Sequence, residues 1–183
     1  MDPFCIWSIC YPDSGSRGLF FISQVHTIWD VLINVLLKRY AGTLAVDKKS
    51  KGLVVEQAVT KLARGDIVAI TPEGIITRST TLRKGKTGTA RMALLARACV
   101  VPVGIQTDYY VWHVQHLIKW LIRPKNKAVI AIGNALRFDH HYGEPISERL
   151  LVEVTADIIQ EIGKLCGKEY NPEKEVTKCA DTE

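Results

Sequence analysis

Residues 65–74 read GDIVAITPEG, in which a short run of β-forming residues, IVAIT at 67–71, passes into a Thr-Pro-Glu-Gly turn. Residues 53–63 before it carry apolar side chains at three- and four-residue spacing, which predicts a helix. The alanine-rich residues 87–98 after it predict a second helix, which leads into the apolar run VVPVGI at 100–105. This order of helix, strand, loop, helix and strand predicts helices packed on a sheet.

The same alternation extends through the rest of the chain. Strands are predicted at 19–23, 42–46, 67–71, 100–105 and 127–133, and helices at 28–40, 53–63, 87–98 and 147–166. The last helix has a serine N-cap, Ser147, and ends at Gly167. We therefore expect a single α/β domain over residues 1–170, with a mostly parallel sheet flanked by helices. Residues 171–183 are charged and aperiodic, and are expected to form a disordered tail.

Length and composition narrow the class of protein. A chain of 183 residues is long enough to form one well-packed domain. It contains no apolar run of about 18 to 20 residues, which a membrane-spanning helix needs, and no secretory signal at its start. Its five cysteines show no CxxC spacing, which argues against a disulfide framework or a zinc site. A cytoplasmic protein with reduced thiols is expected.

A net charge of +5 favours an anionic partner, and anionic lipid, an acidic small molecule and nucleic acid all fit it. Nucleic acid is the weakest of the three, because no reading motif and no basic stripe with interleaved aromatics is present. We therefore expect no nucleic-acid partner.

A candidate phosphate site follows strand 67–71. The Thr71–Gly74 turn leads into a basic loop, which runs into the helix that begins near Thr87, and this is where α/β proteins place ligand sites. The basic residues of the loop are Arg78, Arg83, Lys84 and Lys86. A solvated basic turn is the alternative reading. Nucleotide hydrolysis is excluded, because Thr80 stands where a P-loop ending in Gly85-Lys86-Thr87 needs glycine.

The ordered motifs resemble the lysophosphatidic acid acyltransferase family. They comprise GTLAVDK at 42–48, GDIVAITPEG at 65–74, LRKGKTG at 82–88, ARMALL at 90–95 and VVPVGI at 100–105. In that family a VDR step, an FPEGTRS motif, a basic KG step, an alanine-rich helix and a VPV strand follow in the same order. The resemblance covers roughly residues 1–170.

The resemblance implies transfer of a fatty acyl group from acyl-CoA or acyl carrier protein to a lysophospholipid or glycerol phosphate, with no cofactor and no metal. Glu73 and Gly74 would shape the acceptor site, with Glu73 among the catalytic residues. The acceptor phosphate would be held by Lys48, Arg78, Lys84 and Lys86, and Pro102 would lie beside the acyl pocket. The protein would act at a membrane surface as a peripheral protein.

The family's general base is the histidine of an NHxxxxD motif. Met1-Asp2-Pro3-Phe4 resembles the end of that motif, so that Asp2 would orient a histidine four residues before the chain starts. His26 and Asp30 offer a second pair, but their spacing is one residue short. Without the histidine, the chain as written is expected to lose roughly 100- to 10,000-fold in rate.

Two further features leave the function open. Lys48 replaces the arginine of the VDR step, and Ile75 and Ile76 replace the threonine and arginine of FPEGTRS. A non-catalytic lipid-binding relative is therefore the alternative to the enzyme. Residues 109–123, YYVWHVQHLIKWLIR, fit either a helix in the lipid headgroup region or a helix packed on the sheet.

Overall fold

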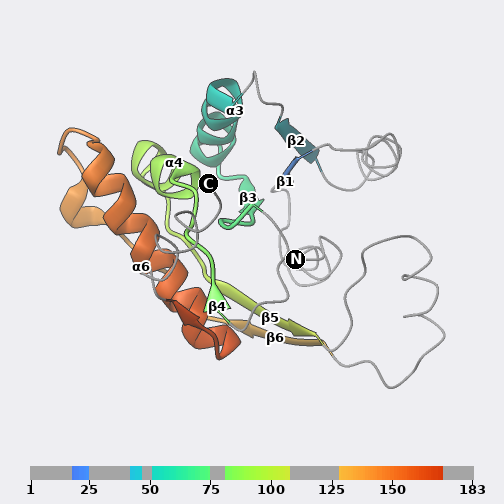
Figure 1. The fold of residues 1–183 in the computed structure, drawn as a ribbon. Helices are drawn as coiled ribbons and strands as arrows, with labels where there is room; N and C mark the ends of the chain where they lie inside the picture. Colours follow the sequence, from blue (N-terminus) through green and yellow to red (C-terminus); the bar gives the residue numbers. More distant parts are fainter. Residues whose placement is uncertain (1–17, 25–41, 47–50, 75–80, 108–127, 171–183) are drawn as a thin grey trace, which may run out of the picture.

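The computed structural model describes residues 18–24, 42–46, 51–74, 81–107 and 128–170. These residues form strands interspersed with helices, in agreement with the predicted α/β class (Figure 1). The predicted helix at 28–40, the residues 109–123 and the tail at 171–183 lie outside the described residues.

The first sheet is parallel and contains three strands in the order β2-β1-β3. These are β1 (Leu19–Gln24), β2 (Gly42–Val46) and β3 (Ile67–Ile70). Phe20 of β1 pairs with Gly42 on one side and with Val68 on the other. Helix α3 (Lys51–Ala63) lies between β2 and β3 in the chain and forms the crossover connection that two parallel strands of one sheet require.

Two further strand pairs complete the described sheet structure. Strand β4 (Thr81–Leu82) pairs in parallel with β7 (Glu169–Tyr170). Strand β5 (Val103–Thr107) pairs with β6 (Ala128–Ile132) in the antiparallel direction. The fold is therefore α/β with parallel ladders, as predicted, and the β5–β6 pair is an antiparallel addition.

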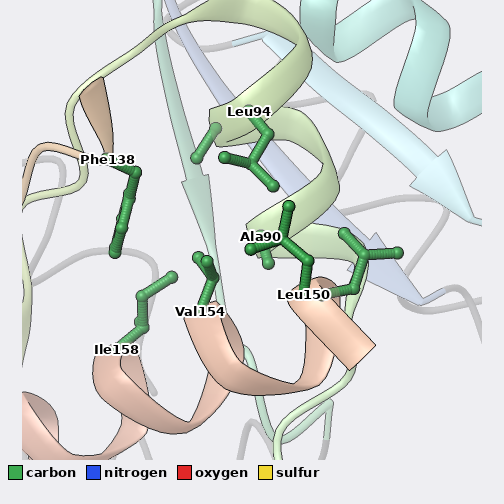
Figure 2. Packing of buried hydrophobic residues seen from close by; sticks show 8 residues of the cluster. Ala90, Leu94, Phe138, Leu150, Val154 and Ile158 are labelled. Carbon is green, nitrogen blue, oxygen red and sulfur yellow. The ribbon is translucent and has the colours of Figure 1, made fainter. Parts of the chain in front are cut away.

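The hydrophobic core lies between the two later helices, α4 (Gly88–Ala96) and α6 (Glu148–Cys166). Figure 2 shows Ala90 and Leu94 of α4 directed toward Leu150, Val154 and Ile158 of α6. Phe138 precedes the short 3-10 helix η1 (Asp139–His141) and closes one side of this cluster. Burial of each large side chain in such a cluster contributes about 1.5 to 3 kcal/mol.

Helix α6 has the boundaries that its capping residues predict. The Ser147 hydroxyl accepts a hydrogen bond of 3.2 Å from the Leu150 N–H, which satisfies one of the free donors in the first turn. At the other end, Gly167 adopts a left-handed conformation with φ of 61°. Figure 1 shows α6 running beside α4 and reaching the β5–β6 pair.

Two predicted strands differ from the structure. The run at 100–105 forms a strand only from Val103, because Pro102 has no N–H to donate to a ladder, and Val100 makes an isolated bridge to Leu136. Val101 is 49% exposed, so this part of the run is not a buried strand. The side chains of β3, predicted as buried, are only half-buried.

None of the helices in the described part of the chain combines the length and the apolar character that a membrane span requires.

Candidate functional site

The turn after β3 is closed by its own main chain. The Gly74 N–H donates a hydrogen bond of 3.1 Å to the Thr71 carbonyl. Gly74 has φ of +71°, a left-handed conformation that glycine adopts without steric cost. The sequence Thr71–Gly74 therefore forms a fixed turn at the carboxyl end of β3.

Lys86 joins the basic loop to this turn through two contacts. Its main-chain N–H donates a hydrogen bond of 2.8 Å to the Pro72 carbonyl. Its side chain lies across Gly74, where an added Cβ would come within 2.6 Å of Lys86 Cε. The structure thus brings together Gly74 and Lys86, which are twelve positions apart and which the sequence proposed for one site.

Glu73 is half-buried and is attached to the same loop. Its Oε2 accepts a hydrogen bond of 3.3 Å from the Arg83 N–H. Burial raises the pKa of the Glu73 carboxyl, and the hydrogen bond from Arg83 and the charges of Lys168 and Arg83 offset part of this rise. Glu73 therefore ties the turn to the residues that enter the basic loop.

Gly85 allows the backbone of the basic loop to pack closely against α6. A Cβ at Gly85 would lie 2.7 Å from Thr155 Cγ2 and 2.8 Å from Ile159 Cγ1. No side chain fits at that distance, so the backbone of the loop packs directly on the helix. The neighbouring Lys84 and Lys86 are exposed, and they are held at the surface by this buried glycine.

The basic loop ends at the N-terminus of α4. The N-cap Thr87 makes no side-chain hydrogen bond to the first turn, and that turn contains no acidic residue. The partial positive charge of the helix N-terminus is therefore not neutralised by a side chain of its own first turn. Together with Lys86, it can attract a phosphate group.

The segment after α6 reaches the same place, which the sequence did not predict. Strand β7 pairs with β4, with Glu169 opposite Thr81 and Tyr170 opposite Leu82. Lys168 immediately precedes β7, and its positive charge lowers the pKa of the Glu73 carboxyl, against the larger effect of burial. The signal that could have indicated this was the lysine directly after the helix-ending Gly167, but two-residue strands have no readable pattern.

Pro102 is buried, and its contacts are with the backbone near β6. Its carbonyl accepts a hydrogen bond of 2.9 Å from the Gly133 N–H, and its ring packs against Gly133. Of the remaining predicted site residues, Asp2, Lys48 and Arg78 lie outside the described residues.

The described histidines, His140 and His141, lie within η1 and not at the Thr71–Gly74 turn. His141 Nδ1 lies 3.5 Å from Glu144 Oε2, and the rings of His140 and His141 are 4.0 Å apart. Tyr142, next to them, packs under Arg97 at the end of α4 opposite to the basic loop. Within the described part of the chain, no group of three or more His, Cys, Asp or Glu side chains is arranged to hold a metal ion.

Comparison with known protein families identifies the family of this chain. The family model described as Acyltransferase matches residues 1–106, which include β1 to β4, most of β5, the Thr71–Gly74 turn and the basic loop. The chain belongs to the acyltransferase family.

One solved structure similar to this acyltransferase chain is the crystal structure of the 1-acyl-sn-glycerophosphate (LPA) acyltransferase PlsC from Thermotoga maritima. The match has a TM-score of 0.44 and 16% sequence identity, and it covers 82% of this chain and 67% of that one. Among the curated proteins, none matches the acyltransferase chain.

Proposed function

We propose that the protein transfers a fatty acyl group from an acyl thioester, acyl-CoA or acyl carrier protein, to a hydroxyl of lysophosphatidic acid or a related glycerophosphate. Membership of the acyltransferase family supports acyl transfer. The contact of Lys86 with the Thr71–Gly74 turn is the observation that carries the choice of acceptor, because it joins a cation to the turn beside a helix N-terminus.

The proposed acceptor site holds the phosphate of the substrate. Lys86 and the main-chain N–H groups at the start of α4 would donate hydrogen bonds to the phosphate oxygens. Lys84 and Arg78 of the same loop, and Lys48 of the VDR-like step, would add positive charge. A phosphate held in this way fixes the distance of the acceptor hydroxyl from the reacting carbonyl.

The reaction moves a proton from the acceptor hydroxyl to the leaving sulfur, and it replaces the carbon–sulfur bond of the thioester by a carbon–oxygen bond. A histidine base oriented by Asp2, as the resemblance implies, removes the proton of the acceptor hydroxyl as the oxygen attacks the thioester carbonyl. The carbon–sulfur bond then breaks, the sulfur takes up a proton, and the products are an ester and a free thiol. No cofactor and no metal enters this balance.

A second candidate is a lipid-binding relative without catalysis. Ile75 and Ile76 favour it, because they replace the polar pair that follows the PEG glycine in the family's motif. The apolar side chains of Val101, Val129 and Ile132, exposed by 49%, 57% and 55%, also support contact with a lipid surface. Peripheral attachment to a membrane is compatible with both candidates and is part of the proposal.

The two candidates are separated by assaying the protein expressed from its complete source gene. We expect acyl-CoA and lysophosphatidic acid to yield free thiol and phosphatidic acid in equal amounts, measured by a thiol reagent and by mass spectrometry. Binding to liposomes without release of thiol for any lysophospholipid or either donor would exclude the enzyme and leave the lipid-binding relative.

A further inference from the structure

A threonine in the first turn of α4 carries a buried hydroxyl without a partner. Thr89 is the second residue of α4 and is only 7% exposed, and its Oγ1 has no hydrogen-bond partner among the described residues. Burial of an unpaired hydroxyl is unfavourable, so most buried hydroxyls are paired. Thr155, the other buried polar residue in the described ranges, donates a hydrogen bond of 2.6 Å to the Leu151 carbonyl. The Thr89 hydroxyl is therefore available to a group that the chain does not supply.

Thr89 lies where the buried face of α4 meets the N-terminus of this helix. It precedes Ala93, a member of the hydrophobic core, by about one helical turn. The Cα–Cβ bonds of a helix tilt toward its N-terminus, so the Thr89 side chain lies over the residues that lead into α4. Lys86 is one of these residues, and its N–H bond to the Pro72 carbonyl holds them at the carboxyl end of β3. Thr89 thus belongs to the helix end that adjoins the Thr71–Gly74 turn.

The same helix end has space and charge for a phosphate. A Cβ added at Gly88 would meet no heavy atom within 4 Å outside its own turn of chain, so open space adjoins the first residue of α4. The first N–H groups of a helix have no partner within it, and here neither the Thr87 side chain nor an acidic residue of the first turn offsets them. With Lys86 beside it, an anion in this space can accept hydrogen bonds from main-chain N–H groups and from a hydroxyl.

We propose that the Thr89 hydroxyl is a ligand of the acceptor phosphate and donates a hydrogen bond to one of its oxygens at the N-terminus of α4. The phosphate oxygen is the acceptor that the buried hydroxyl lacks in the free protein. An acyl acceptor without a phosphate leaves the hydroxyl unpaired, so Thr89 selects phosphorylated acceptors. The identity of the phosphate compound rests on the proposed function, whereas the phosphate contact does not.

The first test measures stability and needs no ligand. Thr89→Val replaces the hydroxyl by a methyl group in the complete protein. Because the hydroxyl has no partner, we expect the midpoint of thermal unfolding to stay the same or to rise by up to about 6 °C. Thr155→Val is the matched control and should lower the midpoint, because it removes a paired hydroxyl. A midpoint of Thr89→Val below that of the wild type would show that the hydroxyl has a partner within the protein, and would overturn the proposal.

The second test measures phosphate binding without acyl transfer. Inorganic phosphate and sn-glycerol 3-phosphate are titrated into the complete protein and followed by calorimetry. We expect Thr89→Val to raise Kd for both by about tenfold or more, because a hydrogen bond to a charged group is lost, and Thr89→Ser to stay within about twofold of the wild type. Thr60→Val should leave both values unchanged, because Thr60 is exposed on α3 and its hydroxyl donates to the Glu56 carbonyl.

Three results of this titration would overturn the proposal. They are no binding of either phosphate to the wild type, equal Kd values in the wild type and Thr89→Val, and a loss confined to glycerol 3-phosphate, which would place the hydroxyl on the glycerol. If circular dichroism shows that the valine variant does not fold, Thr89→Ala, which also lacks the hydroxyl, is titrated in its place.

Steady-state kinetics distinguish failure of this proposal from failure of the proposed function. We expect Thr89→Val to raise KM for lysophosphatidic acid by about tenfold with kcat nearly unchanged, and to leave kcat/KM for the monoacylglycerol unchanged. An equal fall in kcat/KM for both acceptors would contradict a contact with the phosphate. Absence of thiol release with every acceptor, together with weaker phosphate binding in Thr89→Val, would reject the proposed function but keep Thr89 as a phosphate ligand.

Discussion

At the scale of single residues, both the backbone conformation and the packing at position 74 require a residue without a Cβ. Its φ of +71° costs a residue with a Cβ about 1 to 2 kcal/mol, and its Cα faces the Lys86 side chain. We therefore expect Gly74→Ala to lower the free energy of unfolding by about 1 to 3 kcal/mol, measured by urea denaturation. It should also weaken acceptor binding, because Lys86 must move.

Gly52 provides the control for this substitution. It lies in the first turn of α3, and a Cβ there would meet no heavy atom within 4 Å. Gly52→Ala should therefore leave stability unchanged or raise it by up to about 1 kcal/mol. Equal losses in the two variants would mean that Gly74 is not specially constrained.

Glu73 should make stability depend on pH. Because burial raises its pKa in the folded protein, its contribution to stability is fully present below the ordinary glutamate pKa. This contribution is lost as the pH rises through the folded-state pKa. We expect the free energy of unfolding of the wild type, relative to Glu73→Gln, to fall between acidic and neutral pH in urea titrations. A difference that rises with pH would mean that the carboxylate is stabilised in its ionised form.

The residues of the site differ in how far sequence reasoning could find them. Glu73, Gly74 and Lys86 lie within one strand–loop–helix passage, so their order alone predicts that they converge. Lys168 could not be found in this way, because its place depends on the β4–β7 pair, and each of these strands contains two residues. Such pairs are fixed by tertiary packing rather than by local pattern.

At the scale of elements, the basic loop is positioned by its contact with α6. We expect Gly85→Ala to lower the free energy of unfolding by about 1 to 3 kcal/mol, because its Cβ would overlap Thr155 and Ile159. Gly88→Ala is the matched control three residues later, where nothing lies within 4 Å of an added Cβ. Thermal denaturation of both variants measures the difference, and similar losses would show that the loop does not depend on this contact.

Among the described elements, α6 shows most clearly how local chemistry allows a boundary to be predicted. Helix α6 begins after Ser147 and ends before Gly167, where capping chemistry acts locally and can be read from the sequence. The strand predicted at 100–105 was too long, although Pro102 is visible in the sequence and its missing N–H marks where the ladder can begin. The exposure of Val101, in contrast, depends on tertiary packing and has no local signal. The half-burial of β3 likewise depends on what packs over the sheet, which no local pattern specifies.

At the scale of the whole molecule, α6 connects the core to the site. One part of the helix packs Val154 and Ile158 against α4, while Thr155 and Ile159 support Gly85 of the basic loop. Strand–helix alternation predicted the α/β class, since it follows from the periodicity of the apolar residues. The antiparallel β5–β6 pair was not predicted, because the direction of a strand depends on the connection that precedes it.

The central claim is that the Thr71–Gly74 turn and the basic loop bind the phosphate of an acyl acceptor. The most direct test is the ratio of kcat/KM for lysophosphatidic acid to that for the monoacylglycerol with the same acyl chain, measured by thiol release with the complete protein. The account predicts a ratio of at least about 10, which falls toward 1 in Lys86→Met. Equal kcat/KM for the two acceptors in the wild type would contradict it.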